Sequence, residues 1–136
     1  MDPAAALQLP EQRMPRRVDE LWKTTCFELF LRRAGEAGYV EFNLSPSGEW
    51  AAYRFDGYRQ GMADLDIAAA YIENPVRIDG VWRMRASLDS AVFEADLASL
   101  SAVIEEAGGT KSYWALAHAS DKPDFHHPDS FVLELP

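Results

Sequence analysis

Apolar and polar residues alternate in several short segments of the chain, with the period of two that is typical of β-strands. Residues 24–31 (TTCFELFL) are apolar on both faces, which predicts a strand buried on both sides, with Glu28 as the exception. The segment YVEFNLS alternates more strictly, and a Pro-Ser-Gly turn leads from it into EWAAYRF. The pattern therefore predicts a β-hairpin over residues 39–55.

The rest of the chain continues as short elements separated by turn residues. Further extended segments are predicted over residues 68–73, 75–79, 81–88, 112–118 and 130–136. A loop over residues 56–66 holds two glycines and could border a site. Between Ser90 and Glu106, apolar residues are spaced by three and four, which favours a helix on pattern alone. Many short strands with turn signals between them indicate an all-β fold, an antiparallel β-sandwich.

Length and composition predict one domain. The chain has 136 residues, 48% of them hydrophobic, which is enough for a sizeable core. Residues 1–21 have no clean period and are interpreted as an irregular or partly paired leader to a domain over residues 22–136. A single cysteine, Cys26, cannot form an internal disulfide, which favours a reducing, cytoplasmic location. The sequence shows no apolar run of membrane-spanning length, so no membrane partner is expected.

The charge balance limits the class of partner. The net charge is −9, and the few basic residues form only a short cluster (Arg13, Arg16, Arg17, Arg32 and Arg33). Such a surface repels a phosphate backbone, so no nucleic-acid partner is expected. Neutral or cationic ligands fit better, and a binding module, a protein-interaction domain and a small enzyme all remain open.

Glu28 and Trp22 are the residues most indicative of a site. A carboxylate inside an apolar strand needs a ligand, a cation or donor groups to offset its desolvation; the alternative is a structural ion pair with an arginine such as Arg54. Trp22, just before that strand, could form a cleft wall whose indole face suits a sugar ring, or it could cap the core.

Three histidines near the C-terminus raise the question of a metal. His118, His126 and His127 lie among several aspartates, but their spacing matches no known zinc pattern. We therefore expect a hydrogen-bonded polar loop and no metal site, with a divalent cation as the weaker alternative. His126 and Phe125 could supply the opposite wall of the cleft.

The sequence favours binding over catalysis. Cys26 lies in an apolar strand, where a thiol stays protonated and inert, and no serine sits in a nucleophile elbow. Glu28 and Glu41 could be drawn as the paired carboxylates of a glycoside hydrolase, but the sequence does not give their separation. We therefore do not expect an enzyme.

Four segments, LWKTTCFELFL, YVEFNLSPSGEWAAYRFDGYR, SAVIEEAGGTKSYWALAH and KPDFHHPDSFVLEL, resemble the bacterial DOMON-like proteins related to family 9 carbohydrate-binding modules. The resemblance covers most of residues 17–135. It implies an antiparallel β-sandwich of jelly-roll type, with strand and at most a short helical turn over residues 90–106. Family 9 modules hold a terminal sugar between two aromatic side chains, one of them six positions before an acidic residue, a spacing that Trp22 and Glu28 reproduce. Phe125, His126 and His127 stand where the second aromatic is expected.

The resemblance leads to a specific expectation, a non-catalytic domain that binds a carbohydrate or related polyol without a cofactor. The ligand-contacting residues are predicted to be Trp22, Glu28, Asn43, Arg54, His118, Phe125, His126 and His127. One alternative is a haem-binding DOMON domain using Met and His ligands from among His118, His126, Met62 and Met84; another is a protein-interaction domain with a closed pocket. Relatives carry a further segment ahead of RVDELW, so residues 1–21 are expected to be a truncated start of the domain or to leave a sheet edge open. An open edge would favour homodimerisation.

Overall fold

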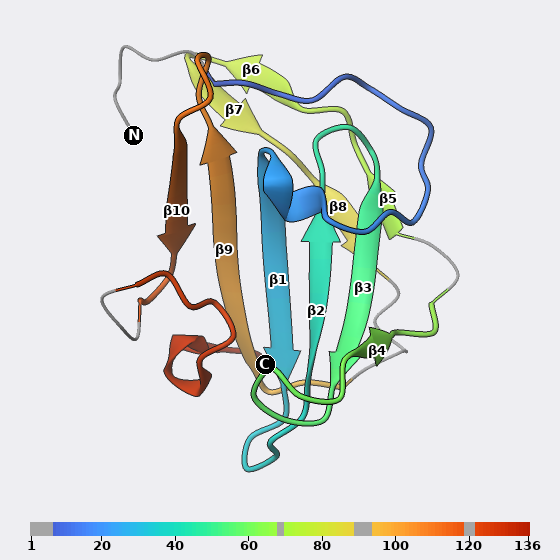
Figure 1. Cartoon of the computed structure of the whole chain (residues 1–136), viewed down its shortest axis with the longest axis vertical. Coiled ribbons are helices and arrows are strands. Elements are labelled where there is room, and N and C mark those ends of the chain that lie inside the picture. The colour runs from blue at the N-terminus through green and yellow to red at the C-terminus, as the bar shows by residue number, and fades with distance from the viewer. Residues whose placement is uncertain (1–6, 68–69, 89–93, 119–121) are drawn as a thin grey trace.

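The computed structural model describes residues 7–67, 70–88, 94–118 and 122–136, and its main feature is an antiparallel sheet of seven strands. The strand order is β10-β9-β1-β2-β3-β4, and β11 also pairs with β9 (Figure 1). These strands are β1 (Cys26–Arg32), β2 (Tyr39–Leu44), β3 (Trp50–Phe55), β4 (Ala63–Asp64), β9 (Leu97–Glu105), β10 (Lys111–Ala115) and β11 (Leu133–Glu134). The predicted all-β class is confirmed.

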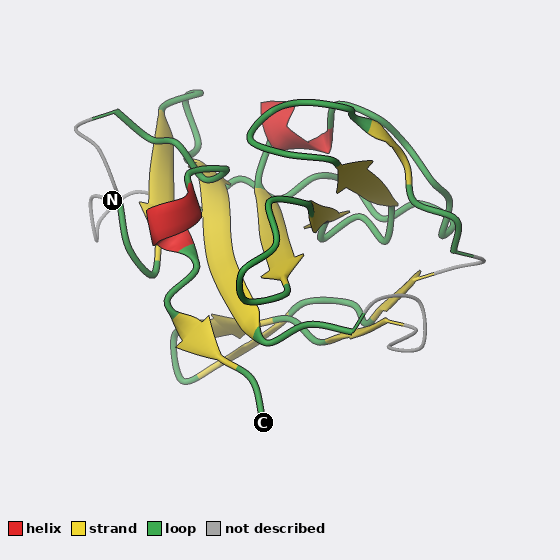
Figure 2. Ribbon diagram, turned by 90° about the horizontal axis from the view of Figure 1, so that it is seen from below, coloured by secondary structure: helices red, strands yellow, loops and turns green. Residues whose placement is uncertain are grey.

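Smaller elements complete the described part of the chain. Strand β5 (Ala70–Ile72) pairs with β8 (Ala86–Leu88), and β6 (Val76–Ile78) pairs with β7 (Val81–Arg83). Figure 2 shows these pairs on one side of the main sheet and two short 3-10 helices, η1 (Leu21–Lys23) and η3 (Pro128–Ser130), on the other. None of the helices in the described ranges has the length and apolar character needed to cross a membrane.

The predicted hairpin over residues 39–55 is confirmed as β2 and β3. The two strands pair in register from Tyr39 opposite Phe55 to Leu44 opposite Trp50. Gly48 closes the turn with a φ of 99°, a left-handed conformation that favours glycine, and a Cβ there would lie 3.2 Å from the Arg13 carbonyl oxygen. The turn is therefore fixed both by its own backbone and by the leader that passes over it.

The second half of the chain holds one expectation that is confirmed and one that needs correction. Residues 97–105 form β9, which pairs with β1 along all seven residues of β1 and with β10, so the strand implied by the resemblance is confirmed there and the helix suggested by apolar spacing alone is wrong. This long-range pairing outweighs a local spacing pattern; residues 89–93 lie outside the described residues. The single strand expected over residues 81–88 is instead two strands, β7 and β8, that belong to different pairs.

Period-two alternation divides the main sheet into two faces with separate cores. The core face, which packs against the β5–β8 side, carries a cluster that includes Val40, Phe42 and Leu44. The opposite face, called the pocket face below, carries a second cluster that includes Phe30 and Tyr39. All six residues of β2 are buried because both faces of this central strand are covered.

The leader is partly paired, as expected. The Val18 amide donates to the Trp50 carbonyl oxygen at 2.8 Å, and Leu7 bridges to Glu106. Arg17 donates to the carbonyl oxygen of Ala52 at 3.0 Å, and its guanidinium lies 4.8 Å from the centre of the Trp50 ring. These contacts anchor the leader along strand β3.

Candidate functional site

Strand register on the pocket face brings four polar side chains together. Glu28 of β1 lies directly opposite Asn43 of β2 and, on its other side, opposite Ser101 of β9. Glu41 lies two residues before Asn43 and so shares its face, diagonally across from Glu28. Side chains at such positions lie close enough to interact. The alternation that builds the sheet thus also gathers these polar groups.

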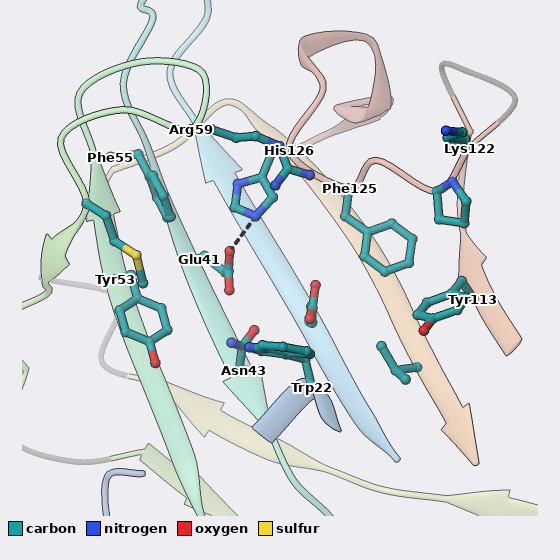
Figure 3. A pocket seen from close by; sticks show the side chains of 14 residues that line it. Trp22, Glu41, Asn43, Tyr53, Phe55, Arg59, Tyr113, Lys122, Phe125 and His126 are labelled. Carbon is teal, nitrogen blue, oxygen red and sulfur yellow. Dashed lines mark ion pairs between the residues drawn. The ribbon is translucent and has the colours of Figure 1, made fainter. Parts of the chain in front are cut away.

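A pocket of about 790 Å³ opens over these residues. Aromatic side chains form its walls, and Figure 3 shows Phe55 and Tyr53 on one side and Phe125 and Tyr113 on the other. Trp22 closes the lower end of the pocket in this view and is 50% exposed. The volume falls in the range of pockets for small-molecule ligands.

Helix η1 presents Trp22 to the pocket because of the backbone that precedes it. Glu20 has a φ of 63° and a ψ of 26°, a left-handed conformation that turns the chain into η1. Leu21 is then buried in the core of the pocket face, while Trp22 points outward. The position of the indole ring is therefore set by a local turn and a buried neighbour.

Glu28 is held in an environment that disfavours its charge. Burial and, to a smaller extent, the nearby charge of Glu41 together raise the pKa of the carboxyl to about 8. The Ser101 hydroxyl donates to Glu28 Oε2 at 3.4 Å and acts in the opposite direction. This long hydrogen bond leaves most of the acceptor capacity of the carboxylate for a ligand.

Glu41 is the second buried carboxyl of the pocket. Burial raises its pKa to about 7, whereas hydrogen bonding to the Asn43 side chain and the charge of Arg59 act to lower it. His126 Nε2 lies 3.1 Å from Glu41 Oε1 (Figure 3), but the contact lacks hydrogen-bond geometry. Within the described ranges, Glu41 Oε1 and Asn43 Oδ1 are both buried acceptors without a hydrogen-bond partner.

His126 is fixed by its surroundings in a neutral form. Its ring packs edge-on against Phe30 and Phe55, at centroid distances of 5.0 and 5.1 Å. The Tyr39 hydroxyl lies 2.7 Å from His126 Nδ1, within hydrogen-bond distance, and also accepts from the Arg59 amide at 3.2 Å. Burial lowers the pKa of His126 to about 4, with a smaller effect from the charge of Arg59. The other ring nitrogen, Nε2, faces Glu41.

Arg59 lies in the loop after β3 and lines the pocket, where an ion pair with Asp124 holds its side chain. Its Nη2 donates to Asp124 Oδ1 at 3.0 Å, and the Tyr58 hydroxyl donates to the other oxygen of the same carboxylate. Burial alone would raise the pKa of Asp124, but these two hydrogen bonds outweigh it and hold the pKa below its ordinary value. The pair links the loop after β3 to the segment that carries Phe125 and His126.

Five of the predicted site residues line the pocket: Trp22, Glu28, Asn43, Phe125 and His126. They come from η1, β1, β2 and the loop before η3, so the fold brings distant parts of the chain to one place. His126 also has a packing role, because its ring contacts those of Phe30 and Phe55, whereas Trp22 is half exposed and does not form the core cap considered as its alternative role.

The placement expected for Arg54 needs correction. Tyr53 and Phe55 point to the pocket face, so by the alternation of β3 Arg54 points away from it, and its side chain is exposed. It is not among the pocket-lining residues. The ion pair considered between Glu28 and Arg54 is excluded for the same reason, since the two side chains lie on opposite faces.

His118 and His127 also lie outside the pocket lining. His118 is exposed and sits behind Phe125, with the two ring centroids 6.2 Å apart. His127 instead caps helix η3, where its Nδ1 accepts from the Asp129 amide at 3.1 Å. In the polar loop that we expected in place of a metal site, His127 therefore has a structural role as a helix cap.

Several lining residues did not follow from the sequence reasoning. These are Tyr53, Phe55, Arg59, Val103, Tyr113, Lys122 and Pro123, while Glu41 and Met62 were considered only for a catalytic pair and for haem binding. The signal for Glu41 was present, since it shares the face of Asn43, and Arg59 and Met62 come from the loop expected to border a site. Tyr113 reaches the pocket only through the pairing of β10 with β9, which local patterns do not specify.

The arrangement is suited to holding a small ligand with hydrogen-bond donors. Its polar groups include two carboxylates and an amide oxygen, all acceptors, and its walls are aromatic. Among the described residues, no group of three or more His, Cys, Asp or Glu side chains could hold a metal ion. Cys26 is buried beside the pocket, and burial raises the pKa of its thiol well above the ordinary value.

No protein-family model matches the chain, and no curated protein or solved structure does either. The resemblance to DOMON-like proteins and family 9 modules therefore remains a prediction.

Proposed function

We propose that this chain is a non-catalytic binding domain that holds a carbohydrate or related polyol in the pocket over Glu28, Glu41 and Asn43. The observation that carries the proposal is the combination of buried acceptors without donors and aromatic walls in one pocket of about 790 Å³. Sugar hydroxyls supply donors to carboxylates, and the C–H faces of a sugar ring pack on aromatic rings. This volume accommodates one or two sugar units.

Trp22 is the proposed stacking platform. Its indole ring is half exposed at one end of the pocket, and Phe125 and Tyr113 form a wall on another side (Figure 3). Lys23 Nζ lies 5.8 Å from the centre of the indole ring, and the exposed part of the ring is available for a sugar ring to pack on.

The alternatives considered from the sequence receive less support. His126 is engaged at Nδ1 by Tyr39 and faces Glu41 at Nε2, so a role as a haem ligand would require both contacts to break. Met84 packs against the core face and is therefore separated from the pocket by the sheet. A domain with a closed pocket does not account for the open volume over Glu28.

The test is calorimetric titration of the full chain against a panel of monosaccharides and disaccharides. We expect saturable binding to at least one sugar, and we expect Trp22→Ala to weaken it at least about tenfold. Arg54→Ala is the matched control and should leave binding unchanged, since its side chain points away from the pocket. Absence of binding across the panel, or equal affinity in Trp22→Ala, would refute the proposal.

The cytoplasmic location also remains a proposal. It is supported by Cys26, which is a free and fully buried thiol.

A further inference from the structure

The floor of the pocket has more hydrogen-bond acceptors than donors. Asn43 is 1% exposed and its Oδ1 has no hydrogen-bond partner among the described residues. Glu41 is 6% exposed, and its Oε1 lies 3.1 Å from His126 Nε2 without the geometry of a hydrogen bond. Glu28 accepts one long hydrogen bond, from Ser101 at 3.4 Å. Buried acceptors of this kind are costly unless a donor reaches them. The floor therefore calls for a group with several hydrogens to donate.

The floor carries two carboxyl groups whose burial raises the pKa to about 8 for Glu28 and about 7 for Glu41, so at pH 7 they become fully ionised only when a cation binds beside them. Glu28 and Glu41 lie diagonally across neighbouring strands, and the nearby guanidinium of Arg59 is engaged by Asp124 at 3.0 Å. Lys122 lies at the far rim of the pocket (Figure 3), where its side chain is exposed.

A second recess of about 420 Å³ adjoins the pocket and shares Trp22, Tyr53 and Met62 with it. Its other lining residues are Asp19, Glu20, Ala63 and Asp64, three of them acidic. Lys23 offsets one of these charges through its contact with Glu20 at 2.8 Å. The acidic character of the pocket thus continues beyond Trp22, and it favours a cation over a neutral ligand.

We infer that the ligand is an amino sugar whose protonated primary amine rests on the floor formed by Glu28, Glu41 and Asn43, with the sugar ring against Trp22. The inference rests on the proposed function and narrows its ligand class. An ammonium group has three donors and no acceptor, which matches the three acceptors of the floor. A hydroxyl in the same place supplies one donor and adds lone pairs that face the carboxylates.

The positive charge of the ammonium group further increases the affinity expected for an amino sugar over that for a neutral sugar. Hydrogen bonds from an ammonium to carboxylates are charge-assisted and roughly twice as strong as neutral ones. The positive charge also relieves the repulsion between the two carboxylates, which burial increases. Aromatic walls add a favourable cation–π contribution when the ammonium lies near a ring. N-acetylation removes the charge and two of the three donors, so the acetylated sugar should lose most of this advantage.

The experiment is calorimetric titration of the full chain at pH 7 with matched sets of sugars. Each set contains an amino sugar, its neutral parent and its N-acetyl form, for example D-glucosamine, D-glucose and N-acetyl-D-glucosamine, and the same for the galactose series. We expect the amino form to bind at least about tenfold more tightly than either relative. Ethanolamine serves as an amine without a sugar ring.

The outcomes distinguish failure of the amino-sugar inference from failure of the proposed sugar-binding function. Equal or tighter binding of the neutral parents would overturn the amino-sugar inference and leave the proposed function in place. Binding of ethanolamine with no binding of any sugar would overturn both, and so would the absence of any binding.

Variants test whether the floor is responsible. We expect Glu41→Gln to reduce the preference for the amino form over the neutral parent to about threefold or less. Glu36→Gln removes one negative charge from an exposed turn and should keep the full preference. Glu28→Gln is the second floor variant and gives the same test if Glu41→Gln does not fold. An unchanged preference in a folded floor variant would refute the inference.

Discussion

Removing the charge of Glu28 should stabilise the fold at neutral and alkaline pH. The carboxyl is 7% exposed and its pKa rises from 4.5 to about 8, mainly through burial and then through the charge of Glu41. A folded-state pKa above the unfolded one means that the folded protein holds more protons between these pH values. The contribution of Glu28 to stability is therefore greatest below about pH 4.5 and is lost as the pH rises through 8.

The size of this effect follows from the pKa difference. At 1.36 kcal/mol for each pKa unit, Glu28 alone lowers the free energy of unfolding by on the order of 4 kcal/mol between pH 4.5 and pH 8. Gln has nearly the same shape, can still bond to Ser101 and does not ionise. We expect Glu28→Gln to be more stable than the unmodified protein at pH 8 by about 1–3 kcal/mol, since water and relaxation reduce the full penalty.

The assay is urea denaturation of both proteins at several values from pH 5 to pH 8. His126 titrates in the opposite sense, because burial lowers its pKa to about 4 and stability is then lost as the pH falls from 6.5 through 4. It is present in both proteins, so the difference between them isolates Glu28. Glu36→Gln controls for net charge. A constant difference across this pH range would refute the reasoning, because it would mean that Glu28 titrates normally.

Three further outcomes are expected. Phe30→Ala removes a fully buried ring whose centroid lies 6.2 Å from that of the Phe131 ring. This change should lower the free energy of unfolding, measured by chemical denaturation, by about 3–5 kcal/mol. Cys26 should not react with an aromatic disulfide reagent in the folded protein but should react fully in urea, because burial raises the pKa of the thiol; rapid labelling of folded protein would contradict this. Strand β10 ends the strand order of the main sheet, so light scattering should show a homodimer that forms with rising concentration; a monomer at all concentrations would reject association through this edge.

The parts of the fold that local sequence determines were predictable. Strands β2 and β3 follow from strict alternation and a turn that contains Gly48, both of which act over a few residues. Strand β9 was not predictable from its own pattern, because its apolar spacing also suits a helix. Pairing with β1 on one side and β10 on the other decides between the two, and both partners are distant in sequence.

In the site, too, the residues that a local pattern identifies could be predicted, and those that depend on long-range strand pairing could not. Glu28 stands out because a carboxylate in an apolar strand is costly wherever the strand is placed. Arg54 was placed wrongly because local alternation does not say which face of a hairpin will hold the pocket. Tyr113 and Lys122 could not be found, since the pairing of β10 and the course of the chain after it bring them to the pocket.

The fully buried strand β2 has a consequence for altering the specificity of this protein. Its even-numbered residues Val40, Phe42 and Leu44 serve the packing between layers, whereas Glu41 and Asn43 line the pocket. Recognition and folding are thus encoded in interleaved but separate positions of one six-residue segment. Random mutagenesis confined to positions 41 and 43 should give libraries that retain the fold while they sample new ligands, which few binding sites built on loops allow.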